Sequence, residues 1–80
     1  MNHTEVIKTV LSNAGASQAD VAKQIGAKSR AVVSERINHT NIGIKALLEL
    51  LEAVGYEIVV REFSGEYKDG EYPIRLSDYE

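Results

Sequence analysis

The sequence predicts a mainly helical domain, a four- to five-helix bundle with a helix-turn-helix, followed by a C-terminal β-strand or hairpin. Apolar residues recur at helical spacing through the first two thirds of the chain, and glycines follow the helical stretches where C-terminal caps belong. After Gly55 the pattern changes to β-branched and aromatic residues. A chain of 80 residues has the size of one domain. We therefore expect a helical bundle in residues 1–55 and a β extension in residues 56–80.

The first two helices are predicted at residues 3–14 and 18–25. Apolar side chains line one face of the first helix, which Gly15 can end: Val6, Ile7, Val10, Leu11 and Ala14. Ser17 is a good N-cap for the second helix, and Asp20 three residues later completes an acidic variant of the capping box. Gly26 provides the C-terminal residue of this helix.

Two further helices are predicted at residues 30–37 and 44–54. Ser29 is the N-cap candidate of the third helix, and Val33 and Ile37 lie one turn apart on its buried side. After a polar loop at 38–41, the fourth helix shows the strongest apolar stripe, formed by Ile44, Leu47, Leu48, Leu51 and Val54.

Residues 56–63 read as a β-strand, and residues 71–76 as a second one with Pro73 at an edge position. Asp69-Gly70 between them is a strong hairpin signal, and we expect residues 77–80 to fray. The ribbon could cover the domain's own core, or its exposed edge could pair with a second copy of the chain. We favour the second, with the homodimer contacts made by Tyr56, Ile58, Val60 and Phe63.

The net charge of −3 is unevenly distributed. Residues 1–45 hold six basic and three acidic residues, +6 − 3 = +3, whereas residues 46–80 hold three basic and nine acidic residues, +3 − 9 = −6. This asymmetry is typical of a basic working half joined to an acidic half, although chance scatter over a solvated surface is the simpler explanation.

Composition also excludes several classes of protein. The chain has no cysteine, so disulfides and thiolate metal sites are excluded. No apolar run reaches the roughly 18 residues of a membrane span, and the N-terminus is no signal peptide, so we expect a cytoplasmic protein without membrane partners. His3 and His39 lack companion ligands, and Ser34 has no base beside it. We predict neither an enzyme nor a metal or other cofactor.

The turn and the third helix have the composition of a nucleic-acid interface. Ala22 is small where the third helix would cross, and Gly26 lets the chain leave the second helix. At roughly 100° per residue from Val33, the outward positions of the third helix are Ala31, Ser34, Glu35 and Asn38. Lys28, Ser29 and Arg30 lie at its exposed N-terminus, and the N-terminal residues of such a helix reach base edges in the major groove.

These segments resemble a known family. Ser17-Gln18-Ala19-Asp20-Val21-Ala22-Lys23-Gln24-Ile25-Gly26 with Val33-Ser34-Glu35-Arg36-Ile37, and the later segment 47–57, are similar to the lambda repressor/Cro-like helix-turn-helix of phage and bacterial regulators, the xenobiotic response element family. The resemblance covers roughly residues 4–60. The sequence departs from the family pattern at two points. The turn before Val33 is one residue longer than the commonest family spacing, which shifts the register of residues 29–31. Strand-like sequence also replaces the usual fifth helix.

The resemblance implies a homodimer that binds double-stranded DNA at a palindromic operator. By position, Gln18 would contact a phosphate, and the groove would be lined by Ser29, Arg30, Ala31, Ser34 and Glu35. The DNA backbone would be contacted by Asn38, His39 and Asn41. We add Lys28 and Lys45 as phosphate contacts, while Arg36 falls at the flank of the helix. For Arg30, Lys28 and Lys45 the alternative is an ordinary solvated charge. Glu35 either accepts from a cytosine amino group or, as we favour, pairs with a nearby cation.

The sequence thus predicts a DNA-binding transcriptional regulator of phage or prophage type, a repressor that blocks a promoter. Two alternatives place a protein partner on the acidic C-terminal region. One is an inhibitor such as an anti-CRISPR protein, in which residues 57–80 imitate nucleic acid or dock on a basic partner. The other is the antitoxin of a toxin–antitoxin pair.

Overall fold

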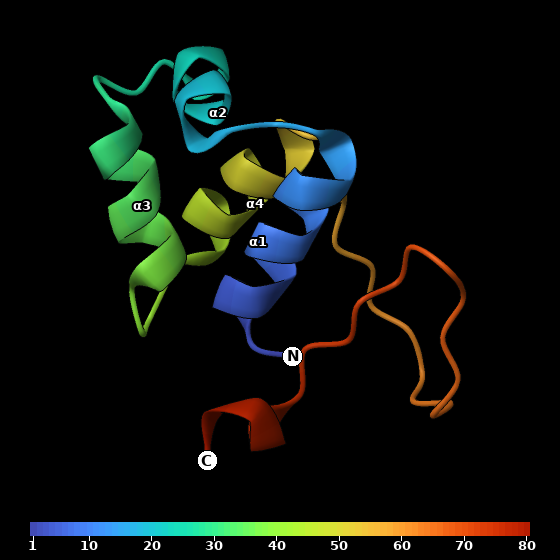
Figure 1. The fold of residues 1–80 in the computed structure, drawn as a ribbon. Coiled ribbons are helices and arrows are strands. Elements are labelled where there is room, and N and C mark those ends of the chain that lie inside the picture. Colours follow the sequence, from blue (N-terminus) through green and yellow to red (C-terminus); the bar gives the residue numbers. More distant parts are fainter.

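The computed structural model describes residues 1–80 and contains four α-helices and no β-strand (Figure 1). The helices are α1 (His3–Ala14), α2 (Gln18–Ile25), α3 (Arg30–Asn38) and α4 (Ile44–Glu52), and a short 3-10 helix, η1 (Leu76–Tyr79), follows near the C-terminus. The predicted bounds of α1 and α2 are confirmed. Helix α3 ends one residue later than predicted, and α4 ends two residues earlier. None of the helices is long and apolar enough to cross a membrane.

Reciprocal caps define the first two helices. The predicted capping box of α2 is present, since Ser17 Oγ accepts from the Asp20 amide and the Asp20 carboxylate accepts from the Ser17 amide. Helix α1 begins with a second box, formed by Asn2 and Glu5. Both helices end at a glycine in the left-handed region, Gly15 with φ 65° and Gly26 with φ 73°, which a side chain would strain. These caps explain why the predicted bounds hold.

All four helices contribute to one apolar core. Eleven apolar residues are buried in a single cluster: Val6, Ile7, Val10, Leu11, Val21, Ala22, Val33, Ile37, Leu47, Leu50 and Leu51. Val33 and Ile37 are fully buried, as the helical spacing of α3 predicts, and Ala22 is buried where a small residue was expected. The inward face of α3 is therefore established, and its opposite face points to solvent.

The predicted C-terminal strands are absent. Residues 56–63 run without a turn or bend, yet no backbone amide or carbonyl from 57 to 63 makes a hydrogen bond within the chain. The Asp69-Gly70 turn does form, closed by the Glu71 amide on the Lys68 carbonyl at 3.0 Å. Gly65 makes an earlier bend with a positive φ of 74°, which leaves only three residues between this bend and the Asp69-Gly70 turn. The first run therefore cannot continue into a hairpin with the second.

Side-chain contacts shape the extension instead. The Arg61 guanidinium donates to the Glu66 carbonyl at 2.6 Å and lies 5.1 Å from the centre of the Tyr67 ring. Arg75 lies 4.2 Å from the centre of the Phe63 ring. Tyr56 is partly buried and packs on the helical core of its own chain. Ile58, Val60 and Phe63 remain exposed.

The C-terminal tail was expected to fray but is docked on the start of α1. The Tyr79 hydroxyl accepts from the His3 amide at 2.7 Å and lies 2.6 Å from His3 Nδ1. The two rings are stacked, with 4° between their planes. The prediction was wrong because it considered only the polar composition of residues 77–80 and not the aromatic ring of Tyr79.

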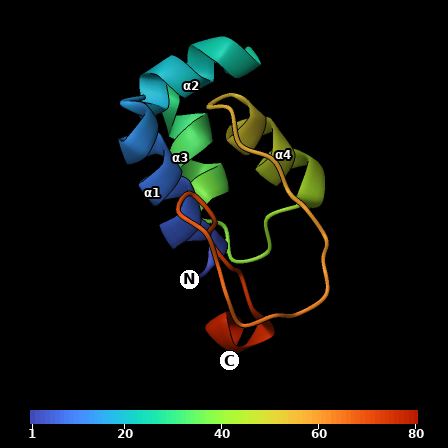
Figure 2. The ribbon, with the colours of Figure 1, turned by 90° about the vertical axis from the view of Figure 1, so that its right-hand side faces the viewer.

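Helix α3 and the extension lie on opposite sides of the molecule. In Figure 1, α3 is at the left of α1 and the extension projects to the right, and Figure 2 shows the extension in front of α1 with α3 behind it. A partner that binds one of these two regions leaves the other accessible.

Candidate nucleic-acid interface

Helix α3 is joined to α2 by a four-residue turn, residues 26–29. The Ala27 amide bonds to the Ala22 carbonyl at 2.8 Å, and the Gly26 amide bonds to the carbonyls of Ala22 and Lys23. This double closure fixes the exit direction of the chain, and Ala27 packs against the core. The length of the turn falls within the range of three to four residues that is typical of a helix-turn-helix.

The C-terminal end of α3 has no glycine cap, and α1 supplies the missing donors. Thr4 Oγ1 donates to the Ile37 carbonyl at 2.7 Å, and His3 Nε2 lies 2.8 Å from the His39 carbonyl. Because a carbonyl only accepts, His3 Nε2 carries a proton, and Nδ1 is free to accept from the Tyr79 hydroxyl. His3 is the only buried polar residue of the chain. Sequence reasoning considered it only as a metal ligand, and nothing in one sequence indicates this bracing role.

A third restraint comes from α4. The Arg36 guanidinium donates to the Glu49 carboxylate at 2.9 Å, with both side chains about one third exposed. Arg36 therefore lies at the flank of α3, as its helical position predicts, and its charge is used within the fold. Ion pairs of this exposure stabilise little by themselves, on the order of 0–1 kcal/mol, but they orient the side chain. Helix α3 is thus restrained by α1, α2 and α4.

The predicted contact residues are concentrated around α3, in its turn and in the segment after it. All are solvent-exposed except Gln18 and Ser34, which are half-buried: Gln18, Lys28, Ser29, Arg30, Ala31, Ser34, Glu35, Asn38, His39, Asn41 and Lys45. Lys45 lies in the first turn of α4, and Gln18 is the first residue of α2. None of these side chains belongs to the apolar core.

The N-terminal end of α3 is electropositive. Lys28 and Arg30 lie at this end and form no ion pair, and Ser29 occupies the N-cap position without the expected side-chain hydrogen bond. Lys45, in the first turn of α4, forms no ion pair either. The Ser29 hydroxyl and the first amides of the helix are therefore available to an anion, which the helix dipole also favours. Glu35 likewise forms no ion pair, so the pairing that we favoured for it is absent.

The far end of the interface is internally ordered. Asn38 Nδ2 donates to the Ser34 carbonyl at 2.8 Å, and the Asn41 amide bonds to His39 Nδ1 at 3.1 Å. These bonds fix the loop after α3 while leaving its polar edges exposed. An ordered loop loses less conformational entropy on binding than a mobile one does.

Gln18 shows an unusual carboxamide. Its Oε1 is buried without a hydrogen-bond donor, and Nε2 makes no hydrogen bond either. An ionised phosphate has only acceptors, so it cannot satisfy Oε1 but can accept from Nε2. Of the two atoms, Nε2 is therefore the one suited to a phosphate contact.

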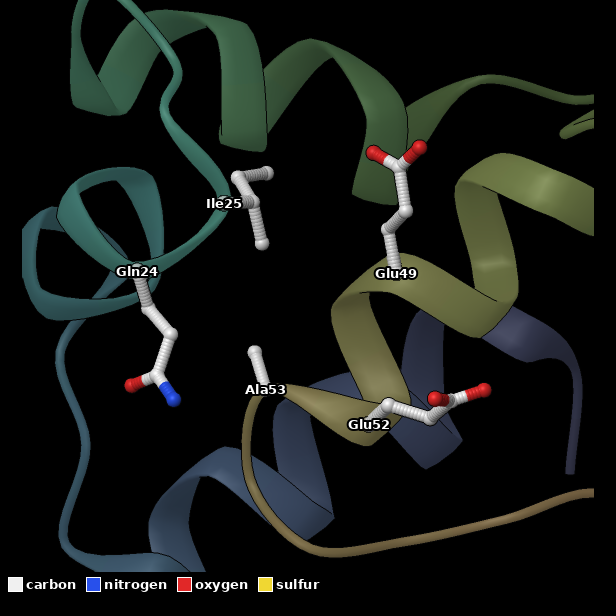
Figure 3. Close-up of a pocket in the computed structure, with 5 residues that line it drawn as sticks. All are labelled: Gln24, Ile25, Glu49, Glu52 and Ala53. Atoms are coloured by element: carbon white, nitrogen blue, oxygen red, sulfur yellow. The ribbon is translucent and has the colours of Figure 1, made fainter.

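A hollow lies between α2 and α4 (Figure 3). This hollow of about 310 Å³ is lined by Gln24, Ile25, Glu49, Glu52 and Ala53. Figure 3 shows Glu49 reaching toward α3, where its carboxylate pairs with Arg36. No group of three or more histidine or acidic side chains with the arrangement of a metal site is present.

Comparisons with protein-family models, with curated proteins and with solved structures gave no match to this chain.

Proposed function

We propose that the protein is a sequence-specific double-stranded DNA-binding regulator, a repressor of the lambda repressor/Cro-like helix-turn-helix type that binds a short palindromic operator as a homodimer. The observation that carries the proposal is α3 itself. Three neighbours restrain this helix, while its outer face makes no contribution to the core and carries unpaired cations at its N-terminal end. A helix presented in this way matches the major groove in width and in the position of its base-reading residues.

The residues divide into two roles. Arg30, Ala31 and Ser34 face the bases, where an arginine can bond bidentately to guanine and an alanine can contact a thymine methyl. The contacts to phosphates come from Gln18, Lys28, Ser29, Asn38, His39, Asn41 and Lys45, which fix the orientation of the protein on the duplex. Glu35, free of an ion pair, is available to accept from a cytosine amino group.

The acidic net charge is compatible with this role because the local field governs encounter with DNA. Between residues 26 and 45, the exposed basic residues are Lys28, Arg30 and Lys45, and Glu35 is the one exposed acidic residue. If each subunit neutralises about three or four phosphates, the log–log salt dependence of a dimer has a slope of about −6.

Selection from a random duplex library, followed by fluorescence anisotropy on the enriched sequence, tests the proposal. We expect an enriched palindrome, retention that weakens with salt at the slope given above, and competition by the palindrome but not by a scrambled duplex. If folded protein retains no DNA at low salt, the DNA-binding function is wrong. Co-purification with a toxin or a CRISPR effector would then support the protein-binding alternatives.

A further inference from the structure

Residues 57–61 form an unpaired, extended and largely apolar segment. All their backbone amides and carbonyls lack hydrogen bonds within the chain, and the segment contains no turn or bend. Ile58, Val59 and Val60 are exposed, with Val60 at 95% exposure. An open edge of this composition is a template for another strand.

The order of the side chains in this segment is self-complementary. In an antiparallel pair centred on Val59, each Glu57 lies opposite Arg61 of the second copy. Ile58 then lies opposite Val60, and Val59 lies opposite itself. Directly opposed residues share one face of a sheet, so the charged pairs flank the two Val59 side chains on one face. The four remaining apolar side chains form the other face.

The neighbouring registers are less favourable. A centre at the bond between Val59 and Val60 is excluded by symmetry, because it would oppose residues whose side chains lie on opposite faces of the two identical strands. Centring the pair on Val60 places Ile58 opposite Glu62 and Glu57 opposite Phe63, which removes both charge pairs. Only the centre at Val59 matches charge with charge and apolar with apolar.

We infer that residues 57–61 are a homodimerisation strand that pairs antiparallel with the same residues of a second copy, with the two-fold axis at Val59. The inference rests on the homodimer of the proposed function and specifies its interface, but it does not require DNA. Arg61 keeps its own-chain bond to the Glu66 carbonyl and its 3.7 Å ion pair with Glu71, since a guanidinium has five donors to distribute. The extension and α3 lie on opposite sides of the molecule, so this interface leaves both copies of α3 exposed.

Single cysteines can locate the axis, because the chain has no cysteine of its own. Opposed residues of an antiparallel pair have Cα atoms about 4.5–5.5 Å apart, within disulfide range, whereas diagonal neighbours lie about 7–8 Å apart, beyond it. We expect Val59→Cys to form a disulfide-linked dimer under mild oxidation. Ile58→Cys and Val60→Cys should each form no disulfide alone and should become linked to each other when mixed.

The outcomes are decisive at each position. A disulfide in Val60→Cys but not in Val59→Cys would show another register and overturn the inference. Linkage in none of the variants, or in all of them equally, would overturn it too. Circular dichroism on each reduced variant checks that the helices are retained.

Charge exchange in the Val59→Cys background provides an independent test. In the Glu57→Arg variant the new arginine lies opposite Arg61 of the second copy, and in the Arg61→Glu variant the new glutamate lies opposite Glu57. Both variants place like charges opposite each other, so we expect each to lose the disulfide dimer. Their mixture restores both charge pairs and should restore the cross-link between unlike chains. Recovery in the mixture separates the interface from damage to the loop around Arg61, and its absence would contradict the register. A cross-linked dimer that binds no DNA would refute the proposed function alone.

Discussion

The helical part and the extension of this protein are stabilised by different interactions. Residues 3–54 are fixed by reciprocal caps and by a core to which every helix contributes. Residues 57–75 bury little apolar surface, and side-chain contacts made by Arg61 and Arg75 shape them. A helix closes its backbone hydrogen bonds within one segment, whereas a strand needs a neighbour to complete them. The segment 57–63 is therefore the part of the molecule whose backbone hydrogen bonds are not completed within the chain.

The largest effect that tests this comparison is a core truncation. Leu50 is fully buried, so Leu50→Ala should lower the free energy of unfolding by about 2–5 kcal/mol. Val60→Ala removes methyl groups from a side chain that is 95% exposed, and we expect a change within about 0.5 kcal/mol. Urea unfolding of both variants at low protein concentration, followed by circular dichroism, measures the two values. Equal losses would mean that the extension belongs to the cooperative core.

The next effect concerns the operator. Arg30→Ala should weaken binding to the selected palindrome by about 1–3 kcal/mol and relax the preference at one base pair. Lys68→Ala removes the same charge from the extension, on the other side of the molecule from α3, and should leave the affinity unchanged. Fluorescence anisotropy at one salt concentration compares them. Equal losses would indicate a general charge effect in place of base reading by α3.

The docked tail is a part of the extension that is held, like the helices, by specific contacts with the rest of the chain. Tyr79→Phe removes the hydroxyl that bonds to the His3 amide and faces Nδ1, at a cost of roughly 1–2 kcal/mol of folding stability. Tyr67→Phe is the matched control, because the Tyr67 hydroxyl makes no hydrogen bond and its ring keeps the contact with Arg61. Thermal unfolding of both variants measures the difference. An unchanged midpoint for Tyr79→Phe would show that the tail does not brace α1.

Ser17 and Ser29 both occupy N-cap positions, but only Ser17 makes a side-chain hydrogen bond to its helix. Ser17→Ala breaks a complete capping box and should cost about 1 kcal/mol of folding stability. Ser29 occupies the N-cap of α3 without a side-chain hydrogen bond. Ser29→Ala should therefore change the folding stability by only roughly a few tenths of a kcal/mol. The same substitution should still weaken DNA binding if the free hydroxyl contacts a phosphate. Denaturation and anisotropy on the same two samples distinguish these effects.

The smallest effect is the dependence of stability on acid. The Ser17 amide, and then its hydroxyl, hold the pKa of Asp20 below its ordinary value, and the Arg75 amide does the same to the pKa of Asp78. A lowered folded-state pKa means that the stabilisation is present above the unfolded value, about 3.9, and is lost as the pH falls through the lower folded value. Asp20→Asn should therefore flatten the loss of stability below about pH 4. Unfolding midpoints at several pH values, for this variant and for Asp69→Asn as control, test the direction.

Much of the helical part was predictable because its signals are local. Ser17, Asp20 and Gly26 specify the ends of α2 within a few residues of sequence, and the apolar spacing specifies the inward face of α3. For α4 the predicted stripe is correct only in part, because Ile44 is 64% exposed and Leu50, which lies outside the predicted stripe, is fully buried. The predicted strands failed because β-branched and aromatic residues show a capacity for strand pairing, and pairing depends on a neighbouring strand that this chain does not supply. His3 braces the end of α3 and is itself bonded to Tyr79, which lies 76 positions away in the sequence. No local sequence pattern predicts a contact of this separation.

The exposed outer face of α3 has a consequence for the variability of this protein. Positions 30, 31 and 35 are exposed and form no hydrogen bond or ion pair with another side chain, so most residues other than proline can occupy them without unfolding the domain. A combinatorial library at these three positions should consist largely of folded proteins. If α3 reads bases as proposed, its specificity can then diverge in few mutational steps on a constant scaffold, without compensating changes elsewhere in the chain.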